Sequence, residues 1–341
     1  MRTGEKTFAL PNMPHRSRYT LCRALPNSRA DVPPEHDFAY YCDEWLASCR
    51  KRLKESTCVK YSTMIELHIK PWLGAYPPLL LNGKVVAAFS EALLYTDSLA
   101  PKTVKDILVT LRSILKYTAI YFPNEFPSID IAYPRDTRKE MRVLSRSEQT
   151  VFVQYLLHDI DPCKFGVLLA LLTGIRIGEL CALRWQQISL SENTIRIAAT
   201  MQRLKDMDAS APGKTKILIG PPKSDTSART IPLTSQAARL CARMHPGQDT
   251  AFVLTNRESY MEPRTLQYRL SRYVQDCGLQ GVLFHTLRHT FATRCVEVGF
   301  EIKTLSEILG HSTTTITLDR YVHSSIELKR RNMEKLAAVG L

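Results

Sequence analysis

Four short segments in the C-terminal half of the chain carry side chains that suit phosphoryl transfer. They are TGIRIGEL with Arg176, PPKSDTSARTIPL with Lys223, HTLRH with His285 and Arg288, and LGHSTTTITLDRYVH with His311 and Tyr321. Guanidinium groups bind two nonbridging phosphate oxygens at once and stay charged at any working pH. Lysine and histidine can donate protons, and a tyrosine hydroxyl can attack phosphorus. The set predicts a phosphoryl-transfer site that needs neither metal nor nucleotide.

The joint occurrence and order of these segments resemble the tyrosine recombinase, or phage integrase, family, and the resemblance covers residues 37–335. It implies a site-specific recombinase that breaks and rejoins DNA, with Tyr321 as the nucleophile that becomes joined to the 3′ phosphate. Because the bond is exchanged rather than hydrolysed, the resemblance implies no ATP and no other cofactor.

The same resemblance implies that the other side chains act around the scissile phosphate. Arg176 and Arg288 clamp it, and His285 donates a hydrogen bond to it. His311 lies ten residues before Tyr321 and can fold back toward it across a threonine-rich turn. A phenol with a pKa of about 10 needs such neighbours to lose its proton during attack.

Lys223 is implied by the resemblance to protonate the leaving 5′ oxygen. It lies between two β-like runs, KILIG and RTIPL, where a hairpin tip would carry it to DNA. A lysine in a turn rich in Pro, Ser and Asp is usually only solvated, so the resemblance carries this assignment. Lys214 and Lys216 on the preceding segment are alternatives, because a shift in hairpin register would exchange the candidates.

The HTLRH segment predicts a helix that projects His285 and Arg288 onto one face, with Leu287 turned toward the core. His289 follows His285 by four residues, a spacing that can bind zinc. The zinc motif needs a glutamate after the first histidine, where this chain has Thr286. We therefore expect no metal site and interpret His289 as a supporting, buried and hydrogen-bonded histidine.

Arg176 follows Thr173 and Gly174, a turn that opens a helix. An arginine at the positive end of a helix is easier to understand if an anion binds there. Glu179, one turn further, has two interpretations: it orients or balances the arginines, or it is an ordinary carboxylate in the first turn of a helix.

The charge balance points to a polyanionic partner. The 341 residues include 46 Lys and Arg against 33 Asp and Glu, which gives a net charge of +13. Residues 136–341 hold 28 basic and 20 acidic residues and so carry +8 of that charge. Charge alone also fits a membrane surface, but no apolar run of about 18 residues exists to span one.

The nine cysteines are scattered and form no CxxC pair, which argues against a disulfide framework or a structural zinc site. Met1–Leu10 lacks the apolar core of a secretory signal. We expect a cytoplasmic protein, bacterial or phage-encoded, that associates with the nucleoid when it is bound to DNA and has no membrane partner.

Periodicity and breaks predict a mainly α fold with a small β-sheet in the catalytic domain (α+β), arranged as a two-domain DNA clamp. The expected parts are a flexible basic arm (1–36), a helical, SAM-like core-binding domain (37–122), a linker (123–143), a catalytic domain (144–325) and a C-terminal helix or tail that can exchange between protomers (326–341). Ser145 and Glu148 form the capping-box pattern that opens the catalytic domain.

Three apolar stripes predict the core of the helical domain: Tyr41, Trp45 and Leu46; Tyr61, Met64, Ile65 and His68; and Val104, Ile107, Leu108, Leu111, Ile114 and Leu115. The segment of the third stripe also carries four basic residues that are candidates for contacts with DNA phosphates: Lys102, Lys105, Arg112 and Lys116.

The basic leader and the LDRYVH context favour an integrase of a phage or conjugative element over a Xer-like chromosome or plasmid resolvase. A DNA-binding protein that keeps the fold without turnover is the alternative from a different class. The expected partners are double-stranded DNA, three further copies of the chain in a homotetramer on synapsed sites, and an accessory directionality factor. Without DNA we expect a monomer or a weaker oligomer.

Overall fold

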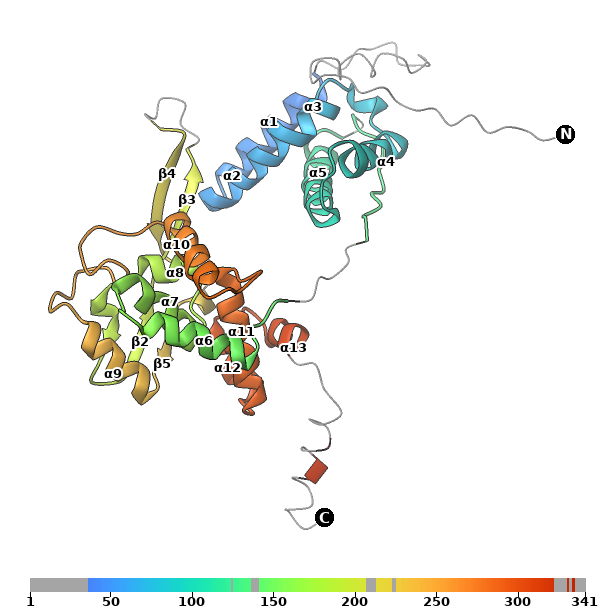
Figure 1. The fold of residues 1–341 in the computed structure, drawn as a ribbon. Coiled ribbons are helices and arrows are strands. Elements are labelled where there is room, and N and C mark those ends of the chain that lie inside the picture. The colour runs from blue at the N-terminus through green and yellow to red at the C-terminus, as the bar shows by residue number, and fades with distance from the viewer. Residues whose placement is uncertain are drawn as a thin grey trace. The chain divides into compact units, whose positions relative to one another are not determined.

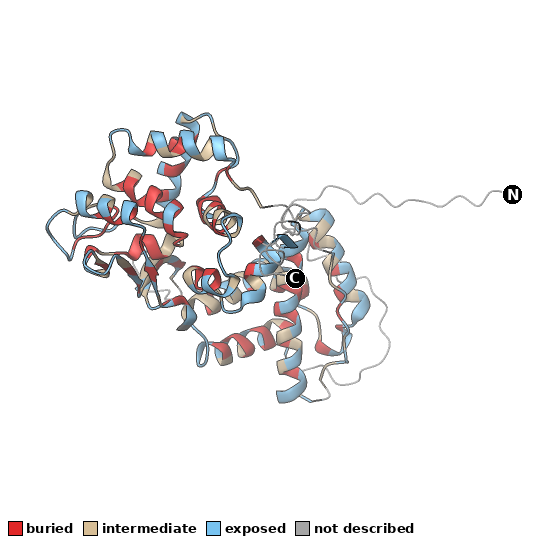
Figure 2. Cartoon of the chain, turned by 90° about the horizontal axis from the view of Figure 1, so that it is seen from below, coloured by how far each residue is buried: buried red, intermediate tan, exposed pale blue. Residues whose placement is uncertain are grey.

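A computed structural model describes residues 36–123, 125–135, 141–206, 213–222, 225–321, 330 and 333–334. The chain divides into two compact units, residues 1–138 and 139–341, and the division falls within the span expected to be a linker. In each unit, buried residues line the inward faces of the helices, while exposed residues cover the outward faces (Figure 2). The expected mainly α fold with a small β component is confirmed.

The first unit is helical. Its helices are α1 (Phe38–Arg50), α2 (Glu55–Met64), α3 (Lys70–Leu73), α4 (Gly83–Glu91) and α5 (Pro101–Tyr121). A π turn at Ile65–Ile69 joins α2 to α3, a second at Ala92–Thr96 extends α4, and Pro78–Leu80 form a 3₁₀ turn. The carboxylate of Asp37 accepts a hydrogen bond from the Tyr40 amide and so caps the start of α1.

Two of the three predicted stripes are buried as expected, and the middle one is partly wrong. Ile65 is buried, but Tyr61, Met64 and His68 are only half-buried. Across α2, the π turn and α3, the buried apolar residues are Cys58, Val59, Ile65, Ile69 and Leu73. The π turn adds a residue to one turn and rotates the apolar face, which a constant helical period does not anticipate. In α5, only Leu115 of its stripe is half-buried rather than buried.

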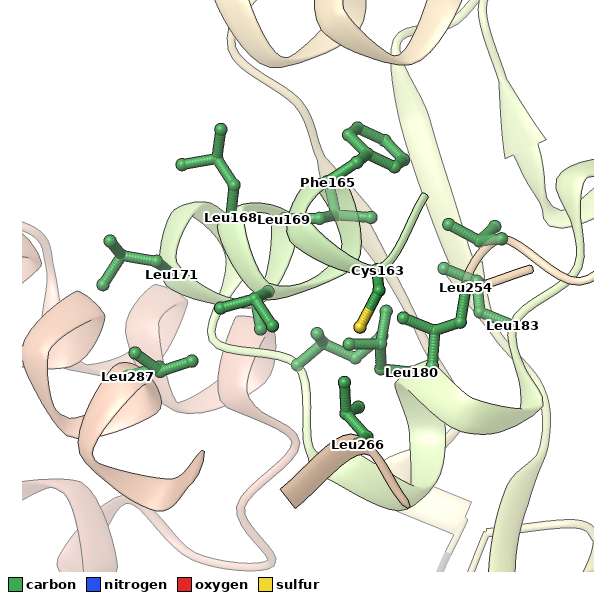
Figure 3. Packing of buried hydrophobic residues seen from close by; sticks show 14 of the residues in the cluster. Cys163, Phe165, Leu168, Leu169, Leu171, Leu180, Leu183, Leu254, Leu266 and Leu287 are labelled. Carbon is green, nitrogen blue, oxygen red and sulfur yellow. The ribbon is translucent and has the colours of Figure 1, made fainter. Parts of the chain in front are cut away.

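The second unit contains the helices α6 (Arg146–Leu157), α7 (Pro162–Thr173), α8 (Ile177–Ala182), α9 (Ser235–Met244), α10 (Pro263–Asp276), α11 (Phe284–Glu297), α12 (Ile302–Leu309) and α13 (Thr314–Tyr321). The predicted capping box is present: the Ser145 hydroxyl accepts from the Glu148 amide, and the Glu148 carboxylate accepts from the Ser145 amide. Helix α7 is apolar on nearly every side and is surrounded by other elements, with Leu180 and Leu266 below it and Leu287 beside it (Figure 3). It forms the centre of the hydrophobic core of the second unit.

The strands form two small antiparallel sheets rather than one. Strand β2 (Thr194–Ile197) lies between β1 (Ile188–Ser189) and β5 (Arg229–Pro232), while β3 (Thr200–Lys205) pairs with β4 (Thr215–Gly220). The β3–β4 ribbon projects from the body of the second unit (Figure 1). KILIG therefore pairs with the strand before it and RTIPL with β2, so the expected hairpin between them is wrong.

The eight cysteines within the described residues are free thiols, and seven of them are buried in the cores of the two units. Among the described residues, none of the helices combines the length and the apolar character that crossing a membrane requires.

Candidate active site

The C-terminal end of α12 holds three arginines that come from three different elements. The carbonyl of Ile308 accepts from Arg229 Nε at 2.6 Å, that of Leu309 accepts from Arg288 Nη2 at 2.5 Å, and that of Gly310 accepts from Arg176 Nη2 at 2.8 Å. Carbonyls at a helix C-terminus have no partner within the helix and carry partial negative charge, so they attract cations. Three successive backbone groups thus gather three guanidinium groups at one point.

Glu179 joins two of these arginines from within the core. Its carboxylate, 3% exposed, accepts from Arg229 Nη1 and Nη2 at 3.0 and 2.9 Å and from Arg176 Nη1 at 2.8 Å. Burial alone would raise the pKa of Glu179, but hydrogen bonds and charge from Arg229 and Arg176 lower it on balance. Of the two interpretations of Glu179, the structure favours the one in which it orients the arginines.

Glycines allow these elements to approach one another. Gly174 ends α7 in the left-handed region with φ 66°, and its carbonyl accepts from Arg288 Nη1 at 2.6 Å. Gly178 in α8 lies against β3, where a Cβ would be 2.6 Å from the carbonyl oxygen of Met201. Gly310 ends α12 with φ 63°, and a Cβ there would lie 3.0 Å from the side chain of Arg229. These contacts leave no room for larger residues.

Arg288 is the most deeply buried of the cations. Its side chain spans from the carbonyl after α7 to the carbonyl that ends α12, and the residue is 3% exposed. Burial, followed by the charges of Arg176 and Arg229, lowers the pKa of Arg288 to about 9, so it remains a cation at neutral pH. Crowded cations without enough anions are unfavourable, and an incoming phosphate would relieve their repulsion.

Tyr321 ends α13 and is 6% exposed. It packs with Leu305 and Leu309 of α12 and with Ala292 and Cys295 of α11. Burial raises the pKa of the Tyr321 hydroxyl, and the nearby charges of Arg288, Arg320 and Arg176 oppose that rise. The phenol therefore stays protonated in the free protein while it lies beside the cations.

Three histidines lie around this phenol. His289 Nδ1 is 2.8 Å from the Tyr321 hydroxyl, and His311 lies parallel to the Tyr321 ring with 6.4 Å between centroids. His285, in the first turn of α11, meets the His289 ring edge-on at 5.4 Å. Burial comes first in lowering all three pKa values, to about 4 for His289 and about 3 for His311. The imidazoles are neutral at physiological pH.

The structure brings together most of the side chains that the sequence singled out. Seven of them come together in the second unit, from the start of α8, from α11 and α13, and from the segment after α12. They are Arg176, Glu179, His285, Arg288, His289, His311 and Tyr321. His289 is hydrogen-bonded as expected, with Tyr321 as its partner, but it is half-buried rather than buried.

Lys223 lies outside the described residues. Lys214 is exposed beside the β3–β4 ribbon, and Lys216 in β4 lies 3.5 Å from Asp206 in an ion pair. The C-terminal helix expected at residues 326–341 also falls almost entirely outside the described residues.

Arg229 was missed by the sequence analysis. In RTIPL it occupies the same face of the strand as buried Ile231, so its side chain points inward. A charged residue on the inward face of a short strand indicates a buried partner of opposite charge. This signal could have identified Arg229 from the sequence.

The four basic residues expected to contact DNA lie on α5 in the first unit, and all are exposed. At 100° per residue, Lys102, Lys105, Arg112 and Lys116 fall within an arc of roughly 80° on the helix surface. Val104, Ile107 and Leu111 lie in a separate arc and are buried. The basic residues therefore form a basic stripe on one face of α5, with exposed Val109 between Lys105 and Arg112.

Comparison with known proteins gives two family matches. Residues 162–327 match the model described as "Phage integrase family", and residues 37–77 match "Phage integrase, N-terminal SAM-like domain". The tyrosine recombinase XerC of Chlamydia caviae is 30% identical over 339 residues, which cover 93% of this chain and 97% of that protein. The ICEBs1 integrase of Bacillus subtilis is 23% identical over 332 residues, which cover 93% and 87% of the two chains.

Solved structures share the fold. The integrase of the transposon Tn1549, in complex with a circular intermediate DNA, superposes with a TM-score of 0.73 at 20% identity and covers 89% of this chain and 100% of that one. A lambda integrase tetramer bound to a Holliday junction gives a TM-score of 0.61 at 17% identity, with 92% and 83% of the chains covered.

Proposed function

The chain belongs to the phage integrase family of tyrosine recombinases, and we propose that Tyr321 is the nucleophile with which it breaks and rejoins DNA. It is a site-specific recombinase of the integrase type. The single observation that carries the assignment of the site is the position of the Tyr321 hydroxyl, on a buried phenol beside Arg288 and at the end of α12 where three guanidinium groups meet.

In the proposed reaction, Arg176 and Arg288 bind the nonbridging oxygens of the scissile phosphate. Both already donate to backbone carbonyls, so they are held in place before DNA arrives. Arg229 does not need to touch the phosphate, because its bonds to Glu179 and Ile308 fix the carboxylate that positions Arg176. Removing one donor from such a preorganised site typically costs about 2.7–4 kcal/mol in the transition state.

The Tyr321 oxygen attacks phosphorus and forms the 3′-phosphotyrosyl bond, and the 5′ oxygen leaves with a proton. His285 and His311 donate hydrogen bonds to the phosphate as charge develops. Lys223 supplies the proton to the leaving oxygen. Its place in the chain, between β4 and Arg229, supports this role. Lys216 is a weaker alternative because it is paired with Asp206, and Lys214 is exposed beside the ribbon.

Double-stranded DNA is the substrate, and the basic stripe on α5 contacts its backbone. We expect four copies of the chain to assemble on two synapsed sites, as the lambda integrase tetramer does on a Holliday junction, with a monomer or weaker oligomer in the absence of DNA. A separate directionality factor would bias the reaction toward integration or excision.

The element that this enzyme serves is a phage or conjugative element. Its similarity to the ICEBs1 integrase and to the Tn1549 integrase supports that choice, while its similarity to XerC keeps a resolvase of chromosomes or plasmids as the second candidate. The two differ in substrate: a resolvase recombines two identical sites, and an integrase recombines two unlike ones.

A nicked suicide duplex that carries the target site tests the proposal, because cleavage beside a nick releases a short fragment and traps the covalent adduct. The wild-type protein gives a protein–DNA band, and the fragment on it reports which bond was cleaved. Tyr321→Phe binds the same duplex and gives no band. Tyr155→Phe is the matched control, since Tyr155 is a hydrogen-bonded tyrosine of the same unit outside the site. An adduct that persists in Tyr321→Phe would assign the nucleophile to another residue.

A further inference from the structure

In the described site the Tyr321 hydroxyl has two hydrogen-bond partners, the Arg288 guanidinium and the His289 imidazole. Its Nδ1 lies 2.8 Å from the Tyr321 hydroxyl, within the ordinary range for a strong hydrogen bond. His289 belongs to α11 and Tyr321 to α13, so the contact joins two elements that the chain separates by 32 positions. The roles proposed above for the arginines, for Lys223 and for His285 and His311 do not explain the contact between His289 and Tyr321.

The direction of that hydrogen bond follows from the neighbours of the phenol. Arg288, Arg320 and Arg176 are the charged groups that act on Tyr321, and guanidinium groups are donors with no acceptor. The phenolic proton therefore needs an acceptor, which His289 Nδ1 provides when the imidazole is neutral. The pKa of His289, lowered to about 4 by burial first and then by His285, Arg320 and Arg288, keeps it neutral at physiological pH.

The other two histidines are placed differently. His311 Nδ1 is bonded to the hydroxyl of Thr317 at 2.8 Å, and the His311 ring lies parallel to that of Tyr321 rather than end-on to its oxygen. His285 lies edge-on to His289 and extends toward solvent in the first turn of α11. Of the three imidazoles, His289 is the one whose nitrogen is directed at the phenolic oxygen.

Resting on the proposed role of Tyr321, we infer that His289 is a catalytic residue, the base that accepts the phenolic proton as Tyr321 attacks the scissile phosphate. In the cleavage step the Oη–P bond forms, the proton passes from Oη to Nδ1, and the P–O5′ bond breaks with a proton from the acid. In the rejoining step the 5′ hydroxyl returns its proton to the acid as its oxygen attacks phosphorus, the Oη–P bond breaks, and the imidazolium returns the proton to Oη.

The surrounding charges make this base dependent on DNA. In the free protein burial first, and then the charges of Arg320 and Arg288, hold the pKa of the His289 imidazole far below the value needed to take a proton from a phenol. A bound phosphate places negative charge among the same cations and offsets their effect, so the imidazole becomes more basic. The phenol meanwhile becomes more acidic as its oxygen bonds to phosphorus. Proton transfer is thus restricted to the DNA-bound state.

Single-turnover cleavage by His289→Asn tests the inference, because Asn offers an acceptor near the position of Nδ1 but cannot take a proton. We expect normal DNA affinity and thermal stability, and cleavage slower by about 10²–10⁴-fold, the usual contribution of a positioned base. The logarithm of the rate should rise with pH at a slope of about 1 in this variant, because hydroxide must then remove the proton, and should be nearly flat in the wild type. His158→Asn, at an exposed position of the same unit, is the control.

Two further measurements separate the base from the acid. A duplex with sulfur in place of the bridging 5′ oxygen has a leaving group that needs no proton, so it should not rescue His289→Asn. Imidazole added to His289→Gly should restore cleavage in proportion to its neutral form. His289→Gln repeats the first test should His289→Asn unfold.

The inference is overturned if the folded variants cleave at the wild-type rate, if their pH profiles match that of the wild type, or if sulfur in the leaving position restores them. Absence of any Tyr321-dependent adduct in the wild-type protein would instead overturn the proposed function itself.

Discussion

Replacing Glu179 by Gln removes one buried negative charge from the centre of the arginine cluster while it keeps the size of the side chain. Glu179 is 3% exposed and accepts from two guanidinium groups, one of which, Arg229, is only 6% exposed. Opposite charges about 4 Å apart at an effective dielectric constant of about 20 attract by about 4 kcal/mol. Removing one partner of a buried pair typically costs about 3–5 kcal/mol, because the remaining charge is left uncompensated.

We therefore expect Glu179→Gln to lower the free energy of unfolding of the second unit by about 3–5 kcal/mol at pH 7, which urea titration of the full chain would measure. Glu297→Gln is the matched control. Glu297 also bridges two arginines, Arg146 and Arg294, but its side chain is 35% exposed. Solvent screens such a pair, so its loss should cost no more than about 1 kcal/mol.

The effect should also depend on pH with a definite sign. The pKa of Glu179 in the folded protein lies below its ordinary value of 4.5, so its contribution is fully present above about pH 4.5 and is lost as the pH falls through the folded value. The difference between wild type and Glu179→Gln should narrow on acidification below that point. Equal destabilisation by Glu179→Gln and Glu297→Gln at pH 7 would refute the reasoning.

Two further predictions concern the geometry and the proton donor. Gly310→Ala should reduce the rate of adduct formation more than tenfold, because its Cβ would press on Arg229 and move the arginine cluster. Gly299→Ala also replaces a glycine with positive φ but meets no neighbouring atom, so it isolates the backbone strain of about 1 kcal/mol, and equal rates in the two variants would exclude displacement of Arg229. The Lys223→Ala variant should cleave an ordinary duplex about 10²-fold or more slowly than the wild type. It should cleave the duplex with a 5′ sulfur leaving group at nearly the wild-type rate, because that leaving group needs no proton. Lys216→Ala should behave as the wild type on both duplexes, and the reverse pattern would identify Lys216 as the acid.

Local patterns in the sequence predicted most of the helices and named most of the side chains that come together in the second unit. Ser145 and Glu148 define a helix start within four residues, and the HTLRH segment fixes one face of α11 by helical spacing alone. The arginines and Tyr321 were identified through motif context, although what holds them together, the carbonyls at the end of α12, has no side-chain signature.

The errors occurred where pairing or helical period departs from the simplest pattern. The hairpin expected around Lys223 was wrong because β4 pairs with MQRLK, a run whose alternation is masked by its charged residues. The buried positions of the second stripe differ from the predicted ones because of a π turn, and no residue type in the sequence predicts such a turn. The bond between His289 and Tyr321 depends on how α13 packs against α11, a tertiary contact that spacing along the chain does not encode.

Three arginines bind the C-terminal end of α12, so the position of this one helix determines the positions of all three. Gly310 and His311 directly follow α12, and α13 begins three residues after His311. Tyr321, at the end of α13, is therefore connected to α12 by a short segment of chain. A tilt of α12 would therefore move Arg176, Arg229 and Arg288 together with Tyr321. Any displacement of this one helix end would thus be felt by all four side chains at once.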